Sequence, residues 1–431
     1  MRVRALAMTA LLLAGCVAPP AVTRDETPVS QGAEPRFSKT GPGAQDYLAS
    51  DGYPKGDRTT FYTVPYLVGT LSRMDEIFEG RVVRKAATAS PLRRAAAEAA
   101  ITWKLGDQEY GLDDYLARNP ATGLLIARGD TILVELYQYA RTDTDRFTSW
   151  SMAKTVTAML IGIAVAEGKI RSVEDTAATY APVLAGSAYG ATTLRDLLQM
   201  SSGVRFIEDY TANDDVRDLA IGSYVQGNAG GPALVTRYNN RVAPAGTRFY
   251  YASAETQTLG FVLRAVTGKP VAEYLHEKIW APMGAEADAT WLIDKSGQEA
   301  TYCCLNAVLR DYARLGLLLA HDGNWRGKQL IPEAWIGDAT TLRDDQPHLK
   351  PVSGQRFFGY GYQTWIFPAT MIAPEKPRRM FALLGVRGQT IYVDPQTRTV
   401  LVHTAVRKQS LDPGGRETIA LWAGTLRTLG D

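Results

Sequence analysis

The chain has 431 residues, of which 45% are hydrophobic and 21% are charged, with 47 basic residues against 45 acidic ones. This composition is that of an ordinary folded protein, which argues against a largely disordered chain and against many membrane spans. Because the charges nearly cancel, the chain lacks the basic excess of a nucleic-acid-binding protein, and we expect no nucleic-acid partner.

The N-terminus has the pattern of a bacterial lipoprotein signal. Two arginines precede an apolar stretch over 5–14, which is too short to span a bilayer and ends in Leu13-Ala14-Gly15-Cys16. This ending resembles a lipobox, which implies removal of residues 1–15, a lipid on the Cys16 thiol, and export. Val17 after the cysteine favours the outer membrane where the cell has one. An ordinary signal peptide with a chance cysteine is the alternative.

Three further regions follow the signal. Residues 16–45 are rich in proline, glycine, threonine and charge without apolar periodicity, which predicts a flexible tether. Over 46–119 short helical and irregular patterns alternate, including the alanine-rich run 92–101, and we recognise no motif there. We expect this part to be an N-terminal segment packed on the main domain, which then occupies 120–431.

Two β-hairpins are predicted near the two ends of that domain. Residues 123–127 and 131–137 flank an Arg-Gly-Asp turn, and residues 390–393 and 399–404 flank an Asp-Pro-Gln-Thr turn. The economical topology joins both hairpins in one antiparallel sheet.

Helical patterns fill the space between the hairpins and close the chain. They lie over 155–167, 194–200, 255–266, 271–279, 307–321 and 417–429. We therefore predict an α/β (α+β) fold in which an antiparallel sheet is flanked by helices, with an inserted, mostly helical region at roughly 168–245.

The motif Ser151-Met152-Ala153-Lys154 stands where a polar run gives way to an apolar helix. Residues three apart on a helix share a face, with Cβ atoms about 5–6 Å apart, so the Lys154 amine can reach the Ser151 hydroxyl. A neutral lysine can take the serine proton. Burial and the positive end of the helix dipole both lower the pKa of such a lysine. Alone, the motif also fits an ordinary helix start with an N-cap serine.

Three segments in chain order resemble the class C β-lactamase-like serine hydrolases. They are 150–155 around Ser151, 197–204 with its Ser-Ser-Gly turn, and 244–253 with Tyr250-Tyr251-Ala252-Ser253. The resemblance implies a β-lactamase/transpeptidase-like fold with Ser151 as nucleophile, Lys154 as general base and Tyr251 as proton relay. A phenol beside a lysine can exchange protons with the nucleophile and protonate the leaving group.

Two of the motifs depart from the family pattern. Ser253 stands where the family has asparagine; its hydroxyl can hydrogen-bond Lys154 or substrate, but it lacks the separate donor and acceptor of an amide. The third motif reads Gly-Val-Arg-Gly-Gln over 385–389, with Val386 where a basic residue is usual.

The altered third motif affects the expected substrate. A backbone amide at Gly388 or Gln389 can still pair with that of Ser151 as an oxyanion hole, since this role uses no side chain. The fixed cation for the carboxylate of a β-lactam or peptide is lost unless Arg387 supplies it. We therefore expect an ester or a linear amide as substrate rather than a β-lactam.

These departures, with Glu208-Asp209-Tyr210 and the run over 303–314, resemble the 6-aminohexanoate-dimer hydrolase branch. The resemblance implies that Tyr210 lines the cleft and contacts the scissile amide; a surface-loop tyrosine is the alternative. The adjacent pair Cys303-Cys304 admits a vicinal disulfide or two buried thiols, and we favour the thiols.

We expect a serine hydrolase that cleaves a small ester or linear amide through an acyl-enzyme on Ser151. The 4 histidines stand in no metal or triad pattern, and the expected site needs no metal or other cofactor. The membrane is the expected partner, through the N-terminal lipid; the oligomeric state is not predicted. The alternatives are a D-alanyl carboxypeptidase or β-lactamase-type cell-wall enzyme and a non-catalytic, wall-binding lipoprotein.

Overall fold

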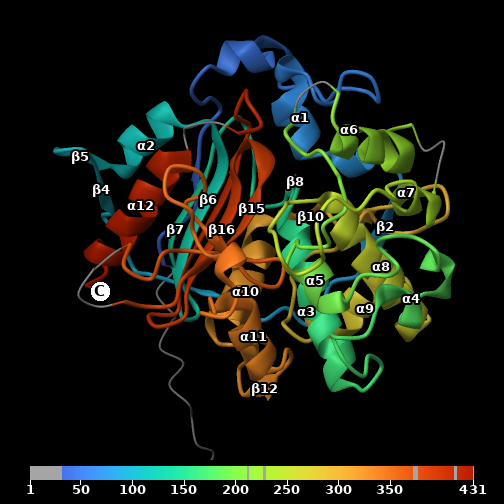
Figure 1. Cartoon of the computed structure of the whole chain (residues 1–431). Coiled ribbons are helices and arrows are strands. Elements are labelled where there is room, and N and C mark those ends of the chain that lie inside the picture. The colour runs from blue at the N-terminus through green and yellow to red at the C-terminus, as the bar shows by residue number, and fades with distance from the viewer. Residues whose placement is uncertain (1–31, 211–212, 227–229, 372–376, 412–414, 431) are drawn as a thin grey trace, which may run out of the picture. The chain divides into compact units, whose positions relative to one another are not determined.

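The computed structural model of the chain (Figure 1) describes residues 32–210, 213–226, 230–371, 377–411 and 415–430. The predicted signal peptide, Cys16 and the first half of the predicted tether lie outside these described residues. The part from Gly32 onward clusters as one unit. None of the helices in the described part is long and apolar enough to cross a membrane.

The main sheet joins the two ends of the chain, as predicted. Strands β6 (Ala121–Arg128) and β7 (Thr131–Tyr137) form the first hairpin, and β16 (Gln389–Asp394) and β17 (Thr399–Ala405) form the second. The two hairpins meet where β17 pairs antiparallel with β6, with Leu401 opposite Ile126.

The strand order of this sheet is β1-β7-β6-β17-β16-β15-β14-β13, and β3 also pairs with β7. The further strands are β1 (Arg36–Phe37), β3 (Arg93–Arg94), β13 (Gly359–Tyr360), β14 (Trp365–Ile366) and β15 (Phe381–Gly385).

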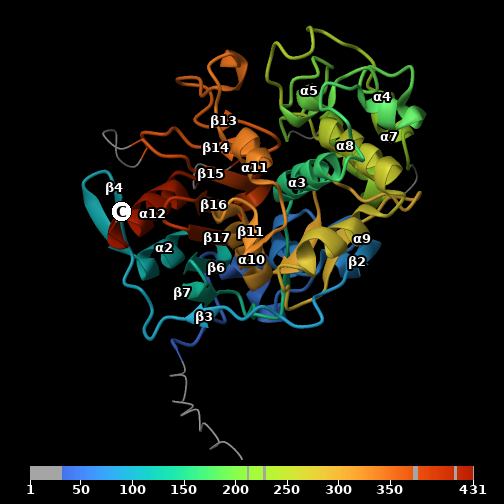
Figure 2. The ribbon, with the colours of Figure 1, turned by 90° about the horizontal axis from the view of Figure 1, so that it is seen from below.

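Both faces of the central strands are buried. Leu124 and Ile126 of β6 share a core with Trp422 of α12 (Gly415–Thr428), whereas Leu125 and Ala127 share the core of α3 (Met152–Ala166) and α10 (Leu309–Ala320). Successive strand residues point to opposite faces, so a strand covered on both sides is apolar at every position. Figure 2 shows α12 and α2 (Leu112–Arg118) on one side of the sheet and α10 with α11 (Glu333–Thr340) on the other.

The helical half of the molecule is built around α3, whose side chains from Met152 to Ala164 are buried. Its main neighbour is α8 (Ser253–Thr267). The region predicted to be helical at 168–245 contains short helices. They are α4 (Ala177–Tyr180), η5 (Pro182–Leu184), α5 (Leu194–Leu198), α6 (Asp215–Ala220), η6 (Ile221–Val225) and α7 (Ala233–Thr236). Helix α9 (Val271–Leu275) continues into the π-helical turn η7 (His276–Trp280).

A second sheet has the order β2-β9-β10-β8 and connects the N-terminal segment to the enzyme core. Its strands are β2 (Gly80–Val83), β8 (Arg146–Thr148), β9 (Ala289–Leu292) and β10 (Leu305–Val308). Because β10 takes up 305–308, helix α10 begins two residues later than the pattern over 307–321 predicts. The N-terminal segment also contains α1 (Leu67–Leu71) and the hairpin of β4 (Thr102–Leu105) with β5 (Gln108–Gly111).

The structure corrects two expectations about the N-terminal part. The tether does not extend to residue 45, because Arg36–Phe37 pair in parallel with β7 and 44–47 form a short 3-10 helix. The alanine-rich run 92–101 is not a helix, because its start, Arg93–Arg94, pairs with β7 instead. In both segments, hydrogen bonding of the backbone to the edge of β7 replaces the local structure that the sequence pattern favours.

Candidate active site

Ser151 lies at the point where the chain leaves β8 and enters α3. Trp150, directly before it, has a φ of 42°, a value that non-glycine residues seldom adopt, so the chain turns sharply here. Ser151 is the N-cap residue of α3 and lines a cavity of about 720 Å³. The serine hydroxyl is therefore reachable from solvent although the helix that follows is buried.

Lys154 is one turn further along α3 and is only 1% exposed. Its Nζ donates hydrogen bonds to the Oγ of Ser151 (2.9 Å) and to the carbonyl oxygen of Tyr302 (3.0 Å). Burial lowers the pKa of Lys154 to about 8, and the negative charge of Glu208 partly opposes this shift. About half of the amine is thus neutral at pH 8 and able to accept a proton.

Tyr251 comes just before α8 and lies beside Ser151 and Lys154. The Lys154 Nζ lies 4.9 Å from the centre of its ring, which stacks on Trp365 at 5.4 Å. Burial raises the pKa of Tyr251, as does the charge of Glu208, while a hydrogen bond with the Ser151 side chain acts in the other direction. The phenol therefore stays protonated where Lys154 is partly neutral, which suits Tyr251 to donating a proton and Lys154 to accepting one.

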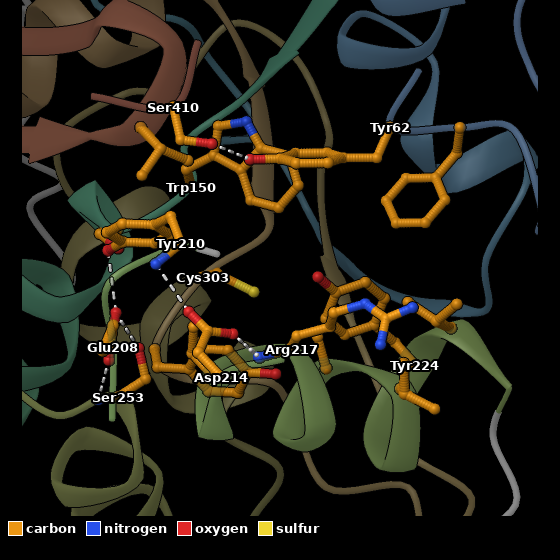
Figure 3. Close-up of a pocket in the computed structure, with 18 of the residues that line it drawn as sticks. Tyr62, Trp150, Glu208, Tyr210, Asp214, Arg217, Tyr224, Ser253, Cys303 and Ser410 are labelled. Atoms are coloured by element: carbon orange, nitrogen blue, oxygen red, sulfur yellow. Dashed lines mark hydrogen bonds between the residues drawn. The ribbon is translucent and has the colours of Figure 1, made fainter. Parts of the chain in front are cut away.

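Aromatic residues line the cavity above Ser151 together with charged, polar and aliphatic ones. Segments from distant parts of the sequence form its walls, and its aromatic lining residues are Phe61, Tyr62, Trp150, Tyr210, Tyr224 and Tyr302. The N-terminal segment contributes Tyr62, whose hydroxyl forms a hydrogen bond of 2.8 Å with the hydroxyl of Ser410. Figure 3 shows this pair on one side of the cavity and Glu208 with Ser253 on the opposite side.

The loop after α5 places Glu208 and Tyr210 in the cavity wall. The Tyr210 hydroxyl donates to Glu208 Oε1 (2.9 Å). Ser253 donates to the same carboxylate twice, through its backbone N–H (2.6 Å) and its hydroxyl (2.9 Å). Tyr210 is thus a cavity residue rather than a surface one, and the Ser253 hydroxyl is engaged by Glu208 rather than by Lys154.

The third motif, residues 385–389, was expected to place the backbone amide of Gly388 or Gln389 at the oxyanion hole. Gly388 and Gln389 are not among the residues that line the described cavity, which Val386 lines instead. The Gln389 side chain donates to the carbonyl oxygen of Ala405 on the neighbouring strand. The Gly388 carbonyl oxygen lies 2.7 Å from Nδ1 of the buried His403.

Arg387 also turns away from the cavity above Ser151. Its φ is 63°, and its guanidinium donates to the carbonyl oxygens of Arg407 (2.8 Å) and Lys408 (2.9 Å). The same group lies 4.0 Å from the centre of the Tyr62 ring. These contacts give Arg387 a structural role, and they leave apolar Val386 at the position where a cation was sought.

Val386, directly after β15, lines the same cavity as Ser151. A Cβ added to Gly385 would come within 3.0 Å of the Trp150 Cβ, so the end of β15 packs against the residue before the nucleophile. Within the described residues, neither the N–H of Ser151 nor that of Val386 donates one of the turn, loop or cap backbone hydrogen bonds. An N–H group that is not used in this way can stabilise a developing oxyanion.

The pair Cys303-Cys304 is a disulfide, which corrects the expectation of two thiols. Cys304 has a φ of 67°, so the chain turns tightly between the two residues. The Cys303 sulfur points toward the cavity in Figure 3, and the preceding residue, Tyr302, supplies the carbonyl that holds Lys154. The disulfide therefore belongs to the floor of the site.

Several residues of the site had no role assigned from the sequence, among them Tyr62, Glu208 and Tyr302. Tyr62 stands in a segment without a motif, and nothing in the sequence indicates that it reaches the cavity. Tyr302 contacts Lys154 through its backbone carbonyl, and because every residue has such a carbonyl, the residue type does not indicate this contact. Glu208 carried a signal, since it precedes Tyr210 in the Glu-Asp-Tyr motif, but its partners come from other segments.

The comparison with protein families gives a match to the β-lactamase family model over residues 112–424. A 6-aminohexanoate-dimer hydrolase of Paenarthrobacter ureafaciens is 25% identical over 389 residues, which cover 88% of this chain and 94% of that protein.

Solved structures give the same fold. A structure described as a 6-aminohexanoate-dimer hydrolase from Bacillus anthracis superposes with a TM-score of 0.77 at 24% identity, covering 91% of this chain and 100% of that one. A family VIII carboxylesterase superposes with a TM-score of 0.54 at 19% identity, covering 72% of this chain and 93% of the esterase. The predicted β-lactamase/transpeptidase-like fold is confirmed.

Proposed function

Because this chain belongs to the β-lactamase family of serine hydrolases, we propose that it cleaves an ester or a linear amide through an acyl-enzyme on Ser151. The observation that carries the proposal is the contact of 2.9 Å between Lys154 Nζ and Ser151 Oγ at the wall of a cavity of about 720 Å³. The two reacting groups of a serine–lysine mechanism are thus already within hydrogen-bonding distance.

The reaction begins when neutral Lys154 takes the proton of Ser151 and the serine oxygen attacks the substrate carbonyl carbon. The negative charge then develops on the carbonyl oxygen, where the N–H groups of Ser151 and Val386 can stabilise it. Tyr251, which stays protonated, donates a proton to the leaving amine or alcohol and is reprotonated from Lys154. Water hydrolyses the acyl-enzyme by the same proton transfers in reverse.

The third motif and Tyr210 favour a linear substrate over a β-lactam. Val386 is apolar and Arg387 donates to backbone carbonyls, so the third motif presents no cation to a β-lactam carboxylate. Tyr210 has its proton engaged by Glu208 and presents only an acceptor to the cavity. The N–H of an amide satisfies that acceptor, and an ester oxygen does not. The related hydrolase of Paenarthrobacter, named for an amide dimer, agrees with this preference.

A substrate screen tests the proposal. The purified protein and its Ser151→Ala variant are assayed with p-nitrophenyl esters, aminohexanoate oligomers, D-amino-acid peptides and a chromogenic cephalosporin. We expect turnover of esters or linear amides that disappears in the variant. Turnover of the cephalosporin as fast as of a short ester supports the cell-wall alternative instead. Absence of any Ser151-dependent turnover supports the wall-binding alternative.

We also propose that the protein is exported and anchored by a lipid on Cys16, on the evidence of the Leu-Ala-Gly-Cys ending of its signal. Metabolic labelling with a clickable palmitate analogue tests this proposal. The label is expected on the full-length chain and not on a Cys16→Ser variant. A chain that is exported but unlabelled overturns the lipid anchor while leaving the signal peptide intact.

A further inference from the structure

Glu208 and Asp214 are the carboxylates among the described residues that line the cavity with Ser151. Asp214 caps helix α6 by accepting from the Arg217 N–H, whereas the mechanism above gives Glu208 no step. The Glu208 Oε1 accepts from the hydroxyls of Tyr210 and Ser253, both at 2.9 Å, and its Oε2 accepts from the Ser253 N–H at 2.6 Å. Burial raises the pKa of Glu208, while the Lys154 charge and these three donors favour its ionised form.

We propose that Glu208 is a positioning residue of this hydrolytic site: its carboxylate fixes Tyr210 and Ser253 on one wall of the cavity and places a negative charge opposite Lys154. The inference rests on the proposed function, because it assigns a role within the same reaction. It also explains how the site tolerates serine at position 253, since the Glu208 carboxylate binds that hydroxyl.

The charge of Glu208 acts on the groups that face it from the surrounding elements. It favours the ammonium form of Lys154. It also disfavours ionisation of the nearby phenols, which are those of Tyr210, Tyr251, Tyr302, Tyr360 and Tyr189. Burial and the carboxylate therefore pull the pKa of Lys154 in opposite directions. With a pKa of about 8, the amine is close to half neutral at mildly alkaline pH.

The proposal predicts the sign of a pH shift. Activity requires neutral Lys154, so kcat/KM falls as pH drops below the pKa of that amine. Glu208→Gln removes the negative charge, lowers the pKa of Lys154 and moves the acid limb of the profile to lower pH, by on the order of one pH unit. A residue that only supported the fold would lower kcat without moving this midpoint.

Three matched variants separate charge from packing. Glu208→Asp keeps the charge, and its midpoint should stay near that of the wild type even if kcat falls. Ser253→Ala removes one hydrogen bond and no charge, and should also leave the midpoint in place. Asp209→Asn removes an exposed carboxylate one residue away, where solvent screens it, and should not shift the midpoint.

The pKa of Lys154 is also measured directly, by titrating lysines labelled with ¹³C at Cε in wild type and Glu208→Gln, with Lys154→Met for assignment. We expect the Lys154 signal to titrate at lower pH in Glu208→Gln than in wild type. An unchanged titration overturns the inference about Glu208. A lowered titration in a protein without Ser151-dependent turnover instead overturns the proposed function while upholding the role of Glu208.

Discussion

The Nζ of Lys154 donates a hydrogen bond of 3.0 Å to the carbonyl oxygen of Tyr302, the residue directly before the Cys303–Cys304 disulfide. This bond uses one proton of the amine and holds the nitrogen beside the Ser151 hydroxyl. A lysine has a long, flexible side chain. Because the fixed carbonyl already holds the amine in place, the side chain loses less conformational entropy when Lys154 acts as a base. The chemistry of Ser151 therefore depends on backbone placed by a distant segment.

The first prediction concerns the pH dependence of the reaction. Because burial lowers the pKa of Lys154 to about 8, kcat/KM should rise with pH through a midpoint near 8 and level off above it. The measurement is ester hydrolysis across the range from about pH 6 to pH 10 at constant ionic strength. An activity that falls over this range as pH rises would show that the base is not a neutral lysine.

The second prediction concerns stability. The pKa of Lys154 is lower in the folded chain, about 8, than its ordinary value of 10.5, so folding must bury a charge below pH 8. Lys154→Met should therefore be inactive yet more stable than wild type by on the order of 3 kcal/mol at neutral pH. The gain should shrink as pH rises from 8 toward 10.5, where the wild-type amine is neutral in both states. Urea unfolding at pH 7 and at pH 10 measures the difference.

The third prediction concerns the choice between amides and esters. Tyr210→Phe removes the acceptor oxygen that an amide N–H would use, so amide turnover should fall about five- to tenfold more than ester turnover. Tyr224→Phe is the matched control, since Tyr224 lines the same cavity but its hydroxyl has no contact with Glu208 among the described residues. Equal losses on both substrate types would remove Tyr210 from substrate recognition.

The fourth prediction concerns the cysteine pair. Alkylation of the unfolded, unreduced protein should leave Cys303 and Cys304 unmodified, and reduction by a dithiol beforehand should make both react. Peptide mapping by mass spectrometry reads out the two states. If both cysteines were alkylated without reduction in protein isolated under oxidising conditions, the pair would be two thiols and not a disulfide.

Local features of the site could be predicted from the sequence because their spacing is short. Ser151 and Lys154 are three residues apart on one helix, so the pattern alone brings them together. The hairpins of β6 with β7 and of β16 with β17 were predictable in the same way, from alternation and turn residues.

Features that depend on long-range packing could not be predicted. The hydrogen bond between Tyr62 and Ser410 joins segments at opposite ends of the chain. Lys154 donates a hydrogen bond to the backbone carbonyl of Tyr302, which the residue type of Tyr302 does not indicate. The residues of the third motif were assigned by resemblance, but the turn after β15 decides which of them faces the cavity. Arg387 is buried against the carbonyl oxygens of Arg407 and Lys408, and Val386 is the residue of this motif that lines the cavity.

The account depends most on Ser151 as an activated nucleophile, and covalent labelling with a fluorophosphonate probe measures this most directly. The wild-type protein should gain one adduct, mapped by mass spectrometry to the peptide that contains Ser151, and Ser151→Ala should gain none. Absence of an adduct on a folded wild-type protein, or an equal adduct on Ser151→Ala, would contradict the account.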